Sequence, residues 1–589
     1  MKRFPLAAAL SVAFASAGLA TSAIAHETAN AHDAVEMDQL LAQEQSVSNF
    51  YRAYFPDAAT GRKAAISFHG QLLESNWKAG YLVMQLEAED IEKLKSFKFR
   101  VVKDEAFAAK HAEMVQRLRA AGSPNLFGAS AAKRAAESQE GVESIPGYPC
   151  YETVEETFAA AQGFTTTYPK LAAWTDVGDS WQKTQGSGGY DMGVLKLTNK
   201  KKSGPNGEPK PKLFVNSAIH AREYTTAPLM LAFAKQLLTG YGKNADATWI
   251  LDHHEVHLLL HTNPDGRKKA EGGLLWRKNT NTAYCGANSN SRGADLNRNF
   301  SYSWNVTNGQ GSSGNPCAET YRGPSAGSEP EVKTVEDYVR SIYPDKRGPG
   351  HNDAAPADTA GIHLDIHSYS ELVLWPYGFR SQAAPNGTAL QTLGRRFAYF
   401  NGYTPEQSIG LYPTDGTSDS ISYGERGVAA FTFELGTSFF QSCSTYDSTI
   451  KPDNLDALMY AARVVRTPYI TPAGPDALQV KLSANGVPAG TPVTVTATID
   501  DTRFNNSNGA EPTQNIASAE VFVDTPPWMP GATPKAMSAS DGSFNSKVEG
   551  VTLSLSTTGM SVGKHFVWVR GVDASGNKGP VSAVFLKIK

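Results

Sequence analysis

Apolar runs and amphipathic stretches alternate through the middle of the chain. Four mainly apolar runs have the length and β-branched content of buried strands, over residues 212–220, 255–263, 361–368 and 427–435. Other stretches carry apolar residues at the three- and four-residue spacing of helices, over residues 227–238, 330–343, 388–400 and 454–465. This order predicts an α/β domain over residues 146–470, with a mixed central sheet flanked by helices on both faces.

The regions on either side of this domain follow other patterns. Residues 26–145 predict a small α+β domain and a linker, with strands over 63–70, 80–87 and 99–105 and a helix over 87–98. The linker is rich in Ala, Ser and Gly and contains Lys133-Arg134. Residues 471–589 hold short alternating runs between Gly, Asn and Pro turns, which predict an all-β sandwich of the immunoglobulin or fibronectin type.

Residues 1–25 have the three parts of a secretory signal peptide. A basic start, Met1-Lys2-Arg3, precedes an apolar run over residues 5–20, and Ala23-Ile24-Ala25 fits a cleavage site. The competing interpretation is an uncleaved anchor, but the run is short and is broken by Ser and Gly. We therefore expect a secreted, extracellular or periplasmic protein with no membrane insertion after signal removal, in an oxidising compartment where four cysteines can form two disulfides.

Composition narrows the classes of function. Of 589 residues, 41% are hydrophobic and 19% are charged, which argues against a disordered chain. The 55 basic and 58 acidic side chains give a net charge of −3, so no nucleic-acid partner is expected. A mean hydropathy of −0.35 without long apolar runs in the body excludes a polytopic membrane protein.

One group of residues suggests a metal site. His220 and Glu223 form an H-x-x-E pair at the end of a predicted strand, where a turn into a helix lets both side chains reach one ion. The strand over 361–368 supplies His363 and His367, and one further His completes a His-Glu-His set with an open position for water. That pattern is typical of a catalytic zinc ion.

Seven motifs in order make the chain resemble the zinc metallocarboxypeptidases, the carboxypeptidase A-like family. They are NSAIHAREYTTAP, TNPDGR, WRKN, GADLNRNF, ETYRGPSAGSEPE, DIHSYSELVLWPYG and FTFELG. The resemblance implies one Zn²⁺ per catalytic domain, held by His220, Glu223 and His367. His363 falls outside the motif and is expected to be a hydrogen-bonded core group, and the cluster of His253, His254, His257 and His261 is expected to be structural.

The same resemblance assigns the chemistry of peptide hydrolysis. Glu434 is implied as the carboxylate that takes the proton of the attacking water and passes it to the leaving amine. Arg277 is implied as the cation that meets the oxyanion, whereas its neighbour Lys278 is expected to be a surface charge.

An exopeptidase must also bind a free terminal carboxylate, and the resemblance assigns this task to Asn297 and Arg298. The spacing before Glu434 places the family's mobile tyrosine at Tyr412, with Tyr423 as the competing choice, and Asn299 is treated as structural.

The resemblance also places Asp419 in the pocket for the terminal side chain, although an alignment shifted by one residue would place Ser418 or Ser420 there. A buried carboxylate there favours basic or mixed basic and apolar termini.

The remaining expectations concern the cysteine pairs, the segment before the catalytic domain and two tryptophans. The Cys285–Cys317 pair is bridged in relatives, and Cys150 and Cys443 are left to pair or to stay as free thiols. Residues 26–145 resemble a prosegment, which implies a zymogen and an activating protease that cuts within about 128–145. Trp568 is expected in the core of the sandwich, and Trp528 is a candidate ligand platform.

We therefore expect a secreted zinc carboxypeptidase that acts on peptide and protein C-termini. The alternatives are a cell-wall peptidase or amidohydrolase on the same fold, which would lack the Asn-Arg-Tyr set, and a non-catalytic binding protein, which would lack a ligand or the general base.

Overall fold

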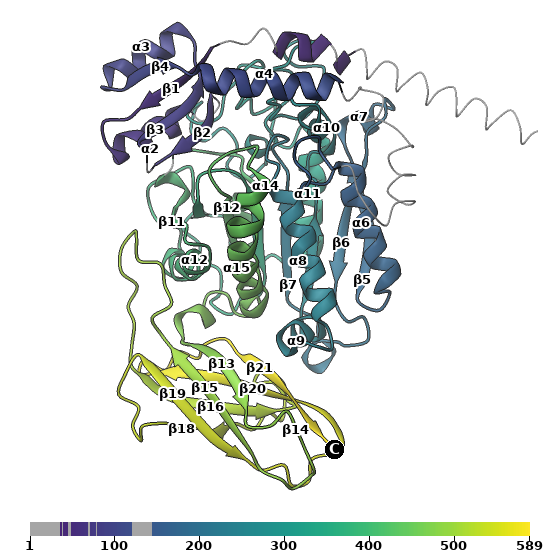
Figure 1. The fold of residues 1–589 in the computed structure, drawn as a ribbon, viewed down its shortest axis with the longest axis vertical. Helices are drawn as coiled ribbons and strands as arrows, with labels where there is room; N and C mark the ends of the chain where they lie inside the picture. The colour runs from purple at the N-terminus through teal and green to yellow at the C-terminus, as the bar shows by residue number, and fades with distance from the viewer. Residues whose placement is uncertain are drawn as a thin grey trace, which may run out of the picture.

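The computed structural model describes residues 36–37, 39–44, 49–68, 71–77, 79–120, 144–410 and 412–589. The predicted signal peptide and Lys133-Arg134 lie outside these ranges. Figure 1 shows three parts along the long axis: a small N-terminal unit at one end, an α/β region in the middle and a β-sandwich at the other end. No helix in the described ranges combines the length and apolar character needed to cross a membrane.

The α/β region is built on an eight-stranded mixed sheet with the order β11-β10-β12-β9-β7-β8-β6-β5. Neighbours are parallel from β12 to β8 and between β10 and β11, and the other pairs are antiparallel. The strands are β5 (Ala172–Asp179), β6 (Asp191–Leu197), β7 (Lys212–Ser217), β8 (Glu255–Leu259), β9 (Ile362–His367), β10 (Leu372–Trp375), β11 (Thr404–Gln407) and β12 (Ala429–Glu434).

Helices cover both faces of this sheet, as the sequence predicts. One face carries α6 (Val154–Thr167), α8 (Thr226–Gly240), α12 (Gly387–Asn401) and α15 (Lys451–Val464). The other face carries α11 (Pro330–Ile342) and α13 (Ser418–Arg426). Shorter helices are α7 (Trp181–Thr184), α9 (Ala245–His253), α10 (Pro264–Glu271) and α14 (Cys443–Thr445).

The carboxyl ends of three adjacent parallel strands meet at one edge of the sheet. Glu434, the last residue of β12, pairs in register with His367, the last residue of β9, and Ser217 of β7 pairs with Ile366. Ligand sites in open α/β sheets form at this edge, because the loops that leave the strands converge there.

The N-terminal unit has a four-stranded sheet with the order β2-β3-β1-β4. Its elements are β1 (Phe50–Tyr54), α2 (Ala58–Ser67), β2 (Leu72–Asn76), β3 (Tyr81–Gln85), α3 (Ala88–Ser96), β4 (Arg100–Lys103) and α4 (Glu105–Ala120). The strand predicted over 63–70 is wrong, because α2 covers most of it. Ala64 and Phe68 lie four residues apart and both enter the core of this unit, which is the spacing of a helix face.

The C-terminal sandwich has two sheets, β13-β15-β19-β18 and β14-β21-β20-β16-β17. Trp568 is 1% exposed and stacks on Phe566, so the prediction that it is buried is confirmed. It does not lie in the core of the sandwich, however: it joins the apolar cluster of the α/β region, whereas its neighbours Val567 and Val569 fill the core of the sandwich. Trp528 packs against Trp249 and His253 of α9 and is therefore no open platform. The strands are β13 (Asp476–Leu482), β14 (Gly486–Val487), β15 (Val493–Asp500), β16 (Ile516–Val523), β17 (Lys535–Ala536), β18 (Ser538–Ala539), β19 (Val548–Leu555), β20 (Gly563–Asp573) and β21 (Ser582–Ile588).

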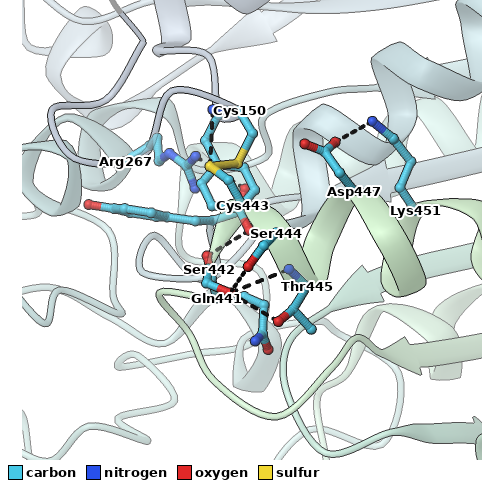
Figure 2. Close-up of a disulfide and its surroundings, with 11 residues drawn as sticks. Cys150, Arg267, Gln441, Ser442, Cys443, Ser444, Thr445, Asp447 and Lys451 are labelled. Atoms are coloured by element: carbon cyan, nitrogen blue, oxygen red, sulfur yellow. Dashed lines mark hydrogen bonds and ion pairs between the residues drawn. A yellow bond between two sulfur atoms is a disulfide. The ribbon is translucent and has the colours of Figure 1, made fainter.

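Both cysteine pairs are bridged. Cys285–Cys317 closes the loop that carries Asn297 and Arg298, as the resemblance implies, and Cys150–Cys443 pairs as well, so the free-thiol alternative is wrong. Figure 2 shows the Cys150–Cys443 bridge, which joins the start of the α/β region to the segment that follows β12. Tyr151, next to this bridge, donates to the carbonyl oxygen of Gln441 at 2.8 Å. The start of the α/β region is thus covalently linked to the segment that follows β12.

The upstream histidine cluster is structural in its geometry. His254 Nδ1 lies 2.8 Å from the Ala462 carbonyl oxygen, and His257 contacts the Tyr338 hydroxyl at 2.6 Å. His261 is fully buried and packs on Phe158, and neither of its ring nitrogens has a hydrogen-bond partner among the described residues. Within the same ranges, none of the cluster belongs to a group of converging metal donors.

The burial of His261 predicts an acid-sensitive contribution to stability. Burial lowers its pKa well below the ordinary value, so below pH ~6.5 the unfolded chain binds a proton that the folded chain does not. The free energy of unfolding therefore falls with falling pH, by up to about 1.4 kcal/mol per pH unit from this group. His261→Phe should make the free energy of unfolding depend less on pH. The measurement is urea unfolding at pH 7.5 and 5.5, with a chelator present to keep the protein free of metal.

A control with the opposite sign is available in His565. Although burial opposes protonation, Asp524 at 2.6 Å raises the pKa of His565, so its contribution to stability is present at low pH and is lost as pH rises. His565→Gln should therefore steepen the decline toward acid. An identical slope for His261→Phe and the unchanged chain would contradict the role given to His261.

Candidate active site

Three buried side chains meet at the carboxyl edge of the sheet. His220, Glu223 and His367 each place one donor atom so that all three atoms lie within 4.8 Å of one another. His367 ends β9, whereas His220 and Glu223 lie in the turn between β7 and α8. Thr226 holds this turn, because its hydroxyl accepts from the Ala218 amide at 3.2 Å and donates to the Glu223 carbonyl oxygen at 3.0 Å.

The donor atoms at this point are close enough to share one cation. His220 Nδ1 lies 2.7 Å from Glu223 Oε1 and 3.1 Å from His367 Nδ1. Burial opposes protonation, yet Asp365 and Glu223 raise the pKa of His367 well above its ordinary value. Burial also opposes ionisation of Glu223, but His220 and His367 hold its pKa well below its usual range. Two imidazoles and one carboxylate in this geometry fit a zinc ion.

Each histidine has a carboxylate on its far nitrogen. His220 Nε2 lies 3.1 Å from Asp295 Oδ1, and His367 Nε2 lies 2.9 Å from Asp365 Oδ2. Carboxylates in such positions orient metal-binding imidazoles and raise their basicity. The sequence alone does not single out either aspartate, although Asp295 lies in the GADLNRNF motif and Asp365 stands two residues before His367.

Glu434 lies beside these side chains and has an unusual environment. It is 8% exposed at the end of β12, and its Oε2 atom has no hydrogen-bond partner in the described part of the chain. Burial raises the pKa of Glu434 to about 8, against the opposing charge of His367. A buried carboxylate with an unpaired oxygen is poised to accept a proton, which is what a general base requires.

Arg277 is buried and held in one orientation. Its Nε and Nη2 atoms donate to Asp295 Oδ2 at 3.0 and 2.8 Å. Since Asp295 also contacts His220, the guanidinium is fixed next to the three donors. Lys278 is not the predicted surface charge: it is 2% exposed and donates to the carbonyl oxygens of Pro316 and Ala318, both at 3.0 Å. A lysine can bury its apolar stem, so the residue type alone does not distinguish a buried lysine from a surface charge.

Asn297, Arg298 and Tyr412 lie close together beside His367. Asn297 Nδ2 is 3.2 Å from His367 Nε2, and Arg298 Nη2 donates to the Tyr412 hydroxyl at 2.6 Å. The Tyr423 hydroxyl instead contacts Asn386 Oδ1 at 3.0 Å. Asn299 is fully buried, and its side-chain nitrogen donates to Arg322, Ser325 and Ser328.

Asp419 lies in the first turn of α13, next to Ser418, whose amide donates to Asn297. It is 4% exposed and accepts from the Thr417 hydroxyl at 2.6 Å. Burial raises the pKa of Asp419, partly offset by that hydrogen bond, and the charge of Asp365 acts in the same direction as burial. A cationic partner would compensate this buried carboxylate.

A His-Glu-His donor set with a raised-pKa carboxylate, at the carboxyl edge of a mixed α/β sheet, defines a metal-dependent hydrolase class. Comparison with known families makes the assignment specific. The profile of the zinc carboxypeptidase family matches residues 158–459, and the chain belongs to that family.

Individual relatives agree with the family match. The chain is 32% identical over 309 residues to the zinc carboxypeptidase of Saccharothrix mutabilis subsp. capreolus, covering 51% of this chain and 66% of that protein. It is 34% identical over 242 residues to carboxypeptidase B of Bos taurus, covering 40% and 53%. The chain spans 66% and 63% of two Mus musculus relatives of the carboxypeptidase A type, which is less than two thirds.

Solved structures show the same fold. The crystal structure of carboxypeptidase A from Helicoverpa armigera aligns with a TM-score of 0.51 at 22% identity, covering 70% of this chain and 96% of that one. Thrombin activatable fibrinolysis inhibitor aligns with a TM-score of 0.50 at 21% identity, covering 71% and 98%. Both likenesses concern the fold alone.

Proposed function

We propose that this protein is a secreted, zinc-dependent carboxypeptidase, made as a zymogen, that removes the C-terminal residue of peptides and proteins. The observation that carries the proposal is the placement of Asn297, Arg298 and Tyr412 beside the His-Glu-His donor set. An endopeptidase has no need of a carboxylate-binding group so near its metal. The predicted signal segment 1–25 and the two disulfides support export.

His220, Glu223 and His367 would hold the ion in this proposal. When bound, zinc lowers the pKa of a bound water to about 7 and polarises the substrate carbonyl. Glu434 takes the proton from the attacking water and later delivers it to the nitrogen of the leaving residue. Its burial at the end of β12 and its unpaired Oε2 atom leave it free to take up and return that proton.

Arg277 and the Asn297–Arg298 pair stabilise negative charges of the substrate. Arg277, held by Asp295, faces the negative charge that develops on the carbonyl oxygen. The planar guanidinium of Arg298 and the amide of Asn297 bind the free carboxylate of the substrate, and Tyr412 covers it. The buried carboxylate of Asp419 favours a basic or mixed basic and apolar terminal side chain.

The test compares N-blocked dipeptides that end in Arg, Lys, Phe or Leu as free acids with the same peptides as C-terminal amides. We expect hydrolysis of the free acids, its loss with a chelator and its return with Zn²⁺. Equal rates on acids and amides would contradict the exopeptidase and favour an amidohydrolase or cell-wall peptidase. A zinc-loaded protein that shows no hydrolysis even after cleavage within about 128–145 would favour a binding protein.

The N-terminal unit lies over the proposed site, which supports a prosegment role for residues 26–145 ahead of a catalytic domain at 146–470. The Ser75 amide donates to the Thr437 carbonyl oxygen at 3.3 Å, and Glu74 forms an antiparallel bridge with Ser438, just beyond Glu434. A cavity of about 1030 Å³ opens between this unit and the α/β region, with Arg222 and Tyr412 in its lining. Substrate entering along this side meets the N-terminal unit first.

Cleavage within about 128–145 is therefore expected to activate the protein. The full-length chain should hydrolyse free-acid dipeptides slowly, and limited proteolysis in that segment should raise the rate as the N-terminal fragment dissociates. Rate and fragment pattern are followed together over time. High activity of the intact chain would contradict the zymogen, and Lys133→Gln with Arg134→Gln is a control if trypsin is used.

A further inference from the structure

A buried hydrogen-bond network extends from the proposed metal site into the sheet and α13. Its centre is Asp365 on β9, which is fully buried. Its Oδ2 atom faces His367 Nε2 at 2.9 Å and accepts from the Ser418 hydroxyl, and its Oδ1 atom accepts from Asn216 Nδ2 at 2.7 Å. Three donors from β9, α13 and β7 thus meet on one carboxylate.

Each hydrogen bond in this network can be assigned a donor and an acceptor without conflict. Because Asn216 Nδ2 donates to Asp365, its Oδ1 atom accepts from His363 Nε2 at 2.6 Å. Burial lowers the pKa of His363 to about 4, so the ring is neutral at pH 7, and its Nδ1 atom accepts from the Ser422 hydroxyl at 2.6 Å. The expectation that His363 is a hydrogen-bonded core group is confirmed.

The carboxylate also determines which nitrogen of His367 carries the proton. The Nδ1 atom of His367 faces the other metal donors, so the neutral ring must carry its proton on Nε2. That Nε2–H group donates to Asp365. Nε2 then has no lone pair for Asn297 Nδ2, 3.2 Å away. The amide donor of Asn297 is consequently left for another acceptor, such as a substrate carboxylate.

Ser418 connects the two functions. Its hydroxyl donates to Asp365, and its backbone amide donates to Asn297 Oδ1 at 2.9 Å, which fixes the orientation of the Asn297 side-chain amide. One residue at the start of α13 therefore links the partner of a metal ligand to a residue of the proposed carboxylate-binding group.

We propose that Asp365 is a positioning residue of the metal site, which holds His367 in its metal-binding form and couples it through Ser418 to Asn297. The proposal rests on the proposed function in assigning zinc to the three donors. It concerns metal binding and not hydrolysis, so the two can fail separately.

The test measures Zn²⁺ affinity of the full chain by competition with a chromogenic chelator, and the visible spectrum of the Co²⁺-loaded protein. Asp365→Asn keeps the shape but removes the charge, and should weaken zinc binding by about 10–100-fold with an altered Co²⁺ spectrum. Ser418→Ala, which removes one donor from the carboxylate, should weaken binding by less.

Asp265→Asn is the matched control. Asp265 is 1% exposed and accepts from the Ser180 hydroxyl at 2.8 Å and the Gln182 amide at 2.7 Å, within another part of the fold. It should bind zinc like the unchanged chain. Unaltered zinc affinity and Co²⁺ spectrum in Asp365→Asn would overturn the proposal. Should that variant fail to fold without metal, unchanged binding in Ser418→Ala would overturn it instead. Zinc loss in Asp365→Asn, with no hydrolysis by the unchanged chain after cleavage within about 128–145, supports the positioning role and contradicts the proposed function.

Discussion

Replacing Glu434 with glutamine should lower kcat on free-acid dipeptides by about 10²–10⁴-fold, the usual contribution of general acid–base catalysis. The glutamine keeps the volume of the side chain but cannot take the proton of the attacking water or return it to the leaving amine. Zinc content should not change, because Glu434 is not one of the three converging donors. KM should change little, because the Asn297–Arg298 group remains intact.

A second buried glutamate provides the control. Glu331 is fully buried, and burial raises its pKa to about 8, as for Glu434. Its carboxylate accepts from the Trp181 amide at 2.8 Å, away from the donor set. Glu331→Gln should retain kcat. Activated Glu434→Gln with full zinc and a kcat within a few-fold of the unchanged enzyme would contradict the role of Glu434.

Arg277→Ala should lower kcat by about 10²–10³-fold, the typical cost of removing one donor to an oxyanion. The effect should fall on kcat, because negative charge on the carbonyl oxygen develops only as the water attacks. Arg277→Lys should recover part of the loss, since the charge returns without the planar group that Asp295 holds through Nε and Nη2.

The measurement is kcat and KM for one free-acid dipeptide, with zinc content determined in parallel. Arg395→Ala is the control, because Arg395 is buried but pairs with Glu511 of the sandwich at 2.6 Å. A rise in KM at constant kcat would contradict the oxyanion role and would point to substrate binding by Arg277.

The sequence predicts the fold wherever one periodicity dominates. The apolar runs over 361–368 and 427–435 correspond to β9 and β12, and the amphipathic stretch over 330–343 corresponds to α11. The run over 63–70 was misassigned because its small and apolar residues fit period two as well as the helical spacing of Ala64 and Phe68.

The sequence predicts the site through motifs and not through contacts. His220, Glu223 and His367 are recognisable because their spacing repeats a family pattern, and the structure brings their donor atoms together. Asp365 opens the DIHSYSELVLWPYG motif without a role assigned to it, and Ser418 lies outside the seven motifs. Their contact joins residues 53 positions apart, so it depends on how α13 packs against β9, which local periodicity does not encode.

Zinc stoichiometry tests the central claim most directly. The dialysed full-length chain is expected to contain one zinc ion per molecule by elemental analysis, and His367→Ala and Glu223→Ala are expected to lose it while Glu331→Gln retains it. A zinc-free unchanged chain, or full zinc in both ligand variants, would contradict a metal site at these residues.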